Sequence, residues 1–158
     1  IVMTPKSLLR HPRCVSQMDE FTNGKFQEVI DDPDFANNPE KAKRVLLCSG
    51  KVYYDLLERK EKEEIKDIAI VRLEQLYPLP ETQLQQILDR YSKAEFCWVQ
   101  EEPKNMGAWT YILRWPESCN RFRLISRKAS ASPATGYHKV HEREQKALVE
   151  EALGLDKK

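Results

Sequence analysis

Three short stretches of the chain carry residues that could bind or transform a ligand. The first is Ser49-Gly50-Lys51, which follows a short apolar run and precedes a helical pattern. The start of a helix presents unpaired backbone N–H groups, so this turn could hold an anion. The spacing is not that of a P-loop, and the chain has no Gly-x-Gly-x-x-Gly sequence. We favour the alternative interpretation that Ser49 is the N-cap residue of the helix.

Charged residues follow the other predicted strands. Glu101-Glu102 is an adjacent carboxylate pair of the kind that can do acid–base work. Neighbouring residues of a strand point in opposite directions, so at most one of the pair would face a site. We therefore favour a capping or interface role for both, and Glu74 has the same status. Four cations at strand ends could form a patch suited to a phosphate group: Lys51, Arg72, Arg127 and Lys128.

The serine and histidine residues near the C-terminus do not complete a catalytic set. Ser130 and Ser132 lie in a loop without a Gly-x-Ser-x-Gly motif, and His138 and His141 are too near them in sequence to argue a triad. His138-x-x-His141 lacks a third ligand, so a metal site is not predicted. These residues alone indicate an α/β domain with an accessory role.

The elements that must position these residues are four strands alternating with four helices. Short apolar runs predict buried strands, and apolar residues spaced three to four apart predict helices. The predicted strands are 44–48, 67–73, 95–100 and 121–126, and the predicted helices are 50–62, 81–91, 108–114 and 138 or 139–153. This alternation predicts a three-layer α/β fold, a mostly parallel sheet with helices on both faces. Ligands of such sheets bind beyond the carboxyl ends of the strands.

Residues 1–40 are predicted to be a lead-in segment, with a short helix and a loop, that packs on a domain formed by residues 41–158. Pro12 prevents a long helix near the start. Residues 26–30 carry a weak strand pattern, and residues 31–40 have the composition of a surface loop. Residues 1–3 read as the tail of a strand, so we expect this chain to be a fragment of a longer multidomain chain.

The composition of the chain is typical of a soluble globular domain. The chain has 158 residues, 41% of them hydrophobic and 32% charged, and a formal net charge of +1. This balance is ordinary for a soluble domain and predicts neither nucleic acid nor membrane as a partner. No apolar run approaches the roughly 20 residues of a membrane span. Cys48 and Cys97 lie in strand patterns, and we expect buried free thiols rather than disulfides or a metal site.

Five stretches resemble one family. They are MTPKSLLRHP (3–12), CSGKVYYDLLE (48–58), IAIVRLEQLYPLP (68–80), WVQEEPKNMGAW (98–109) and SASPATGY (130–137). Together they are similar to the C-terminal domain of the decarboxylating, thiamine-diphosphate-dependent component of 2-oxoglutarate dehydrogenase. The resemblance covers nearly the whole chain. It implies the fold of a transketolase C-terminal domain, a mostly parallel sheet with one antiparallel edge strand.

The resemblance also implies an activity for the full-length chain. Family members decarboxylate 2-oxoglutarate on thiamine diphosphate with Mg2+, in the citric acid cycle and energy metabolism linked to glycolysis. They form homodimers and work in a multienzyme complex with a lipoyl-bearing succinyltransferase and a dihydrolipoamide dehydrogenase. The cofactor and catalytic residues lie in preceding domains, so we expect none in this chain, which would be inactive alone. We expect the bacterial cytoplasm, with the mitochondrial matrix as the alternative.

Two roles then remain for the residues of this chain. An interface between domains or subunits is expected to involve Trp98, Glu101, Glu102, Asn105 and Trp109. Some relatives carry a regulatory acyl-CoA site, and the residues that could form such an anion site are Lys6, Arg10, Ser49, Lys51, Arg72, Arg127 and Lys128. The alternatives are a related thiamine-diphosphate 2-oxoacid dehydrogenase, a transketolase-like enzyme, or a free-standing interaction module.

Overall fold

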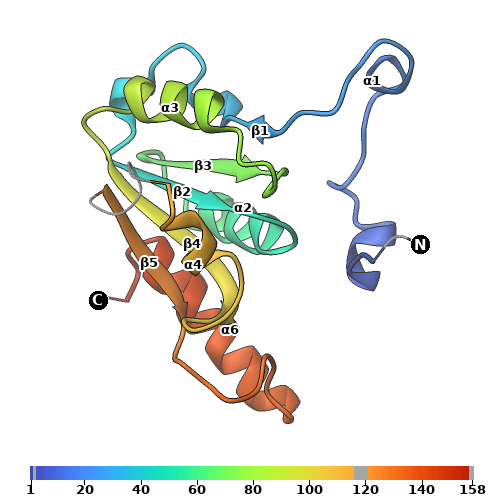
Figure 1. The fold of residues 1–158 in the computed structure, drawn as a ribbon, viewed down its shortest axis with the longest axis vertical. Coiled ribbons are helices and arrows are strands. Elements are labelled where there is room, and N and C mark those ends of the chain that lie inside the picture. Colours follow the sequence, from blue (N-terminus) through green and yellow to red (C-terminus); the bar gives the residue numbers. More distant parts are fainter. Residues whose placement is uncertain (2, 116–120, 157–158) are drawn as a thin grey trace.

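The computed structural model describes residues 1, 3–115 and 121–156 and shows an open α/β sheet with an extended N-terminal segment (Figure 1). The strands are β1 (Val29–Ile30), β2 (Arg44–Cys48), β3 (Ile68–Leu73), β4 (Glu95–Pro103) and β5 (Phe122–Arg127). The α-helices are α1 (Met18–Thr22), α2 (Val52–Lys62), α3 (Glu81–Arg90), α4 (Trp109–Ile112) and α6 (His138–Ala152). Short 3-10 helices are η1 (Lys6–Arg10), η2 (Pro33–Phe35) and η3 (Pro39–Lys41).

The sheet of the described residues has the strand order β1-β3-β2-β4-β5. β2 lies at its centre, paired in parallel with β3 and β4, and β5 extends the parallel set. β1 pairs antiparallel with β3 at the edge, with Val29 opposite Leu73. The predicted mostly parallel sheet is therefore confirmed. The antiparallel edge strand, which only the family resemblance implied, is β1.

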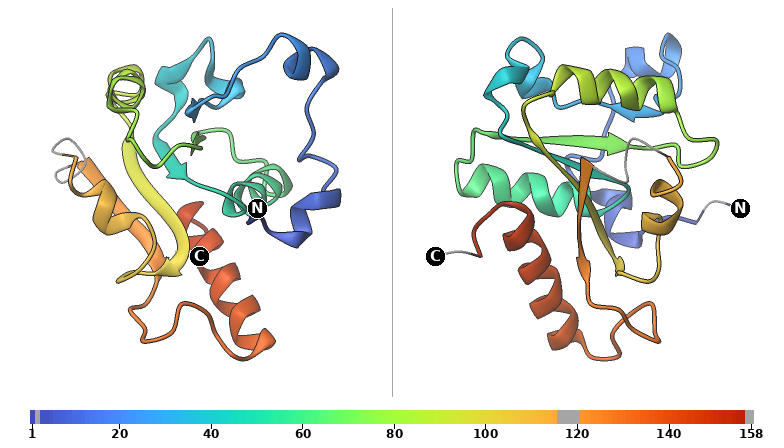
Figure 2. Two further views of the ribbon diagram at one scale, coloured as in Figure 1. Left: turned by 45° about the vertical axis from the view of Figure 1, so that its right-hand side comes forward. Right: turned by 60° about the vertical axis from the view of Figure 1, so that its left-hand side comes forward.

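Successive side chains of the sheet point to opposite faces and form two hydrophobic cores, one on each face. Val45 and Leu47 of β2 pack toward α3 and α4, whereas Leu46 and Cys48 pack toward α2 and α6. Figure 2 shows the same separation, with α3 and α4 on one side of the sheet and α2 and α6 on the other. Because both faces are covered, the central strands are near-continuous apolar runs. The predicted three-layer architecture is confirmed.

The predicted elements match the observed ones closely, and the largest differences lie around β4. β4 runs to Pro103, three residues beyond its predicted end, because Pro103 pairs with Arg127 of β5 after a shift in register that begins at Val99. α4 covers only Trp109–Ile112, within the predicted 108–114. α6 ends as predicted at a glycine, since Gly154 has a φ of +69°.

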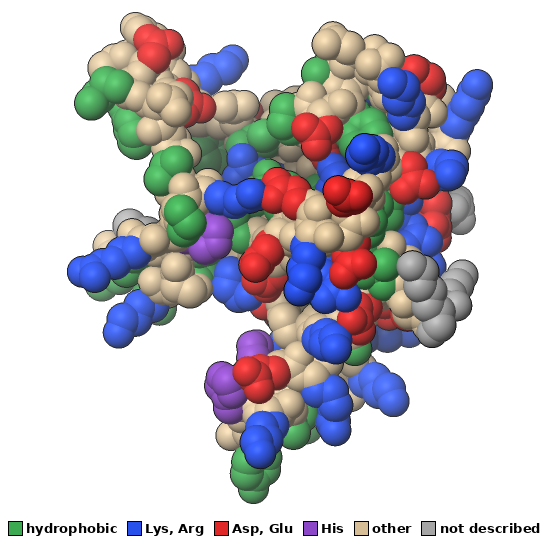
Figure 3. Space-filling view, turned by 180° about the vertical axis from the view of Figure 1, so that it is seen from behind, with side chains coloured by type: hydrophobic (Ala, Val, Ile, Leu, Met, Phe, Trp, Pro, Cys, Tyr) green, Lys and Arg blue, Asp and Glu red, His purple; other side chains and the backbone are tan. Residues whose placement is uncertain are grey.

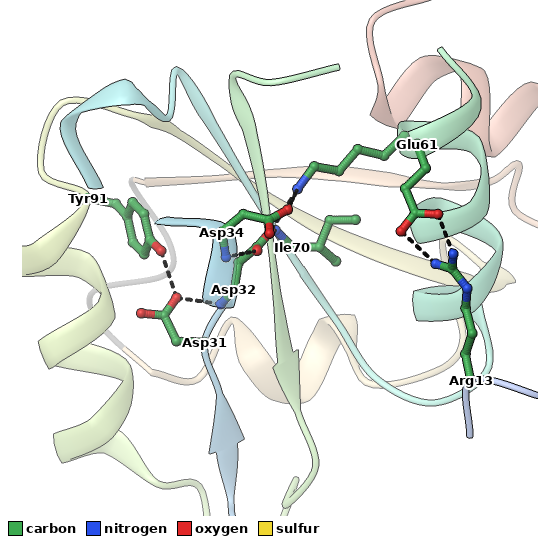
Figure 4. A network of polar contacts seen from close by, with 8 residues as sticks. Arg13, Asp31, Asp32, Asp34, Glu61, Ile70 and Tyr91 are labelled. Atoms are coloured by element: carbon green, nitrogen blue, oxygen red, sulfur yellow. Dashed lines mark hydrogen bonds and ion pairs between the residues drawn. The ribbon is translucent and has the colours of Figure 1, made fainter. Parts of the chain in front are cut away.

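The acidic stretch after β1 is more deeply buried than its composition predicts. Asp32 is 6% exposed, and its Oδ2 accepts from Lys60 Nζ and from Ile70 N, both at 2.9 Å (Figure 4). Lys60 is itself buried, and Phe35 lies in the core. The prediction of a surface loop over 31–40 was wrong in this respect, because an ion pair across 28 residues satisfies the buried carboxylate. Part of the predicted lead-in segment thus belongs to the sheet and core.

Two cysteines are buried, as predicted. Cys48 and Cys97 are free thiols inside the sheet, whereas Cys14 is free and exposed. Cys119 lies outside the described residues. Burial raises the pKa of the Cys48 thiol to about 12 and that of Cys97 to about 11. In the part of the chain that the structure describes, every helix is too short or too polar to cross a membrane.

Candidate functional site

A cavity of about 700 Å³ lies at the carboxyl ends of the central strands, where open α/β sheets bind ligands. One wall is the Ser49-Gly50-Lys51 turn, and the floor is formed by β4 from Trp98 to Glu102. Tyr77 and Tyr111 form an aromatic rim, with ring centroids 6.4 Å apart. The cavity is therefore an aromatic hollow with charged groups along one side.

Two of those charged groups, Lys51 and Glu101, are already paired with each other. Lys51 Nζ lies 3.0 Å from Glu101 Oε1 and 2.5 Å from Asp55 Oδ2. Gln145 of α6 donates to the same two acids, at 2.8 Å to Glu101 and 2.7 Å to Asp55. Burial opposes the charge on Lys51, but its bonds with Asp55 and Glu101 outweigh that cost, so its pKa is raised. We call Lys51, Asp55, Glu101 and Gln145 the polar brace.

Arg127 continues the polar brace toward the end of β5. Its Nη2 donates to Gln145 Oε1 at 2.8 Å and lies 3.1 Å from His141 Nδ1. Its Nη1 lies 3.8 Å from Glu144 of α6. The brace therefore ties α2, β4, β5 and α6 together through hydrogen bonds and ion pairs. Because these side chains are paired with one another, we interpret this edge of the sheet as a rigid support rather than as a set of free catalytic groups.

A second polar centre holds the loop between β4 and α4. Gln100 is 3% exposed, and its Oε1 accepts from Trp98 Nε1 at 2.9 Å and from Trp109 N at 3.0 Å. Its Nε2 donates to the Met106 carbonyl at 2.7 Å. A buried amide with partners for both its ends fixes the loop against the strand. Sequence reasoning gave no role to Gln100, although it lies in the stretch WVQEEPKNMGAW, and none to Gln145, because residue type and local spacing do not signal these contacts.

The cations of the predicted anion site do not converge on one cavity. Ser49 and Lys51 line the 700 Å³ cavity, while Arg72 lines a cavity of about 590 Å³ beside the N-terminal segment. Arg127 and Lys128 line a third, of about 240 Å³, after β5. Lys6 and Arg10 are exposed on η1. The hypothesis of an acyl-CoA site formed by the whole set stays a prediction.

Ser49 does not cap the helix that follows it. Gly50 turns the chain with a φ of +74°, so α2 begins at Val52 and its N-cap position is Lys51, whose side chain makes no capping bond. The favoured interpretation of Ser49 was therefore wrong. The left-handed glycine displaces the helix start by two residues from the position that the pattern indicates.

The residues predicted for an interface occupy different depths. Trp98 is 1% exposed and belongs to the core, and Trp109 is half-buried against it. Glu101 is in the polar brace. Asn105 exchanges two hydrogen bonds with the backbone of Ser130, at 2.9 and 3.0 Å, and so joins two neighbouring loops. Glu102 and Asn105 are exposed, and an interface role for them stays a prediction.

The remaining residues that could do chemistry also have local partners. His138 Nδ1 lies 3.4 Å from Glu142 on the same helix, and Glu74 lies 3.6 Å from Arg72. Among residues 1, 3–115 and 121–156, no group of three or more His, Cys, Asp or Glu side chains could hold a metal ion.

The sheet order and the antiparallel edge strand define an α/β domain with a mostly parallel sheet. A family model described as 2-oxoglutarate dehydrogenase C-terminal matches residues 15–153. The chain belongs to this family.

Several bacterial proteins are similar to the chain over 98% of its length. They include the 2-oxoglutarate dehydrogenase E1 component of Haemophilus influenzae, 48% identical, and the oxoglutarate dehydrogenase of Buchnera aphidicola, 43% identical. The multifunctional 2-oxoglutarate metabolism enzyme of Mycolicibacterium vanbaalenii is 47% identical. The chain spans only 17%, 17% and 13% of the lengths of these three relatives.

Proposed function

We propose that this domain supports a thiamine-diphosphate-dependent enzyme that decarboxylates 2-oxoglutarate and transfers the succinyl group to a lipoyl arm. The observation that carries the proposal is the match to relatives named for 2-oxoglutarate, at 43–48% identity over nearly the whole chain. The domain itself contributes a rigid edge rather than reacting groups, in keeping with the mutual pairing of Lys51 and Glu101.

The described residues do not fit the cofactor of that reaction. Thiamine diphosphate with Mg2+ needs oxygen ligands grouped around the metal, and the described residues offer no such group. Lys51, the cation at the cavity of about 700 Å³, is paired with Asp55 and Glu101 rather than free for a diphosphate. We therefore assign cofactor binding to the part of the full-length chain that precedes this domain.

We infer a homodimer of the full-length chain, acting with a lipoyl-bearing succinyltransferase and a dihydrolipoamide dehydrogenase in the bacterial cytoplasm. The bacterial sources of the relatives support that compartment over the mitochondrial matrix. The related alternatives are a 2-oxoacid dehydrogenase with another substrate and a transketolase-like enzyme.

A substrate assay of the full-length enzyme separates these possibilities. With thiamine diphosphate and Mg2+ present, we expect CO2 release from 2-oxoglutarate and succinyl transfer to a lipoylated domain. Residues 1–158 alone should give neither product. Turnover of pyruvate or of a ketose phosphate in place of 2-oxoglutarate would assign the chain to one of the alternatives.

Regulation by an acyl-CoA is a separate part of the proposal. Of the predicted cations, Lys51 stands at the largest of the three cavities, while Arg127 stands at another. Calorimetric titration of the full-length dimer with acetyl-CoA should therefore compare the wild type with Lys51→Ala and with Arg127→Ala. A weaker affinity in one variant would identify the cavity that is used. The same affinity in all three proteins would contradict a site at either residue.

A further inference from the structure

The N-terminal segment exposes apolar side chains to a degree that the rest of the molecule does not. We call residues 1–26 the arm. Of the nine large hydrophobic side chains that are exposed among the described residues, seven lie on the arm: Ile1, Met3, Leu9, Val15, Met18, Phe21 and Phe26. The other two are Tyr77 and Tyr137. A concentration of this kind marks a surface that packs against another one.

The arm extends away from the sheet and returns to it at β1 (Figures 1 and 2). Seen from behind in Figure 3, apolar side chains gather on the projecting lobe that carries α1. Its attachment to the domain is specific but small. Arg13 forms a two-pronged ion pair with Glu61 of α2, at 2.6 and 2.5 Å, and the ring of His11 lies 4.8 Å from that of Tyr54.

The helix within the arm, α1, does not bury any of its residues against the domain. α1 is five residues long and none of them is buried. Its start is capped reciprocally, because Gln17 N donates to Glu20 Oε2 at 2.6 Å. Met18 and Phe21 are at i,i+3 spacing and so share one face of the helix. A single helical turn is marginal in water, so an exposed apolar face indicates a partner that covers it.

Room for that partner exists between the arm and the domain. Phe21 and Val15 of the arm line one side of the cavity of about 590 Å³, and Tyr53 and Leu57 of α2 line the other. Side chains from a covering surface could therefore be held between the arm and α2.

We propose that the arm is a docking segment that packs against the part of the full-length chain preceding residue 1. The inference rests on the proposed function, in which this domain ends a longer enzyme. The family is described as C-terminal, and the chain spans 17% of the Haemophilus relative, so the rest of such an enzyme leads directly into the arm. A covalent link gives that part an effective concentration in about the millimolar range, which favours it over a separate copy.

Photo-cross-linking in the full-length enzyme tests the occupant directly. With p-benzoylphenylalanine in place of Phe21, irradiation should join the arm to residues preceding Ile1 within one chain, leaving the mass of the chain unchanged on a denaturing gel. The same replacement at Tyr137, which is 79% exposed against 76% for Phe21, is the matched control and should give at least fivefold less of this product. A product of doubled mass would assign the arm to a second copy and overturn the proposal, as would equal yields at the two positions.

Hydrogen exchange provides a second measurement that does not need the cross-linker. In the full-length enzyme, the amides of residues 18–26 should exchange at least about tenfold more slowly than an unstructured peptide. Phe21→Ser should remove most of this protection, and Tyr137→Ser should leave it intact. Unprotected amides in the wild type would overturn the proposal. Neither readout depends on turnover, so an enzyme that docks its arm but ignores 2-oxoglutarate contradicts the proposed function alone.

Discussion

Gly107 lies against the side-chain amide of Gln100, so close that a Cβ on the glycine would stand 3.0 Å from Gln100 Nε2. The φ of Gly107 is +69°, in the left-handed region that side chains rarely adopt. Both facts explain why the stretch from Gln100 to Trp109 needs a glycine at this position. The glycine lets the loop close over the amide that holds it.

Gly107→Ala should therefore destabilise the domain. The unfavourable φ and the close contact together should lower the free energy of unfolding by about 2 kcal/mol. Urea denaturation of residues 1–158 measures this. Gly136→Ala is the control, because nothing lies within 4 Å of a Cβ there and its φ is not in the left-handed region. Equal stability of the two variants would contradict the close fit at Gln100.

Gln100→Ala should cost more than a typical surface change. It leaves Trp98 Nε1, the Trp109 amide and the Met106 carbonyl without their partner inside the protein. We expect a loss of about 3 kcal/mol, since each buried unpaired group costs about 1–3 kcal/mol. Gln86→Ala, on the exposed side of α3, should change stability by less than about 0.5 kcal/mol. Near-wild-type stability of Gln100→Ala would show that the loop between β4 and α4 keeps its conformation without the hydrogen bonds of Gln100.

Lys60→Met should destabilise the domain although it adds apolar surface. It removes the cation from the buried Asp32 carboxylate, at 2.9 Å, and leaves that charge inside the protein. Breaking a buried pair from one side costs about 3–5 kcal/mol. Lys62→Met, an exposed position on the same helix, is the control in thermal unfolding. A gain in stability at Lys60 would mean that Asp32 is satisfied by the Ile70 amide alone.

The buried thiol of Cys48 should make stability fall at alkaline pH. Its pKa is raised by burial from 9.0 to about 12 in the folded chain. Above pH 9 the unfolded chain loses this proton while the folded chain keeps it, so the free energy of unfolding decreases as the pH rises toward 12. The expected slope from this thiol is roughly 1.4 kcal/mol per pH unit.

The comparison of wild type with Cys48→Ala between pH 9 and pH 10.5 isolates that slope from other titrating groups. The variant should show a shallower decline. Parallel pH profiles would mean that the Cys48 thiol ionises equally in the two states.

The pattern of residues was enough to predict the central architecture. The apolar runs at 44–48 and 68–73 can bury all their side chains only as strands that are covered on both faces of a sheet. Their location and their parallel pairing therefore follow from local sequence. The stripe Leu84, Ile87 and Leu88 predicts α3 for the same reason. The pattern predicted the start of α2 less accurately. Ser49 was expected to cap the helix, but the left-handed Gly50 moves the start to Val52.

Only the tertiary structure decided which polar groups meet. Asp32 and Lys60 are 28 residues apart and Gln145 lies 44 residues from Glu101, so no local spacing signals either contact. The antiparallel pairing of β1, a strand of two residues, depends on the exposed backbone edge of β3 rather than on its own sequence. Local sequence determines which segments must be buried, because burial depends on side-chain type. The folded chain determines how charges are paired, because pairing depends on where distant segments come together.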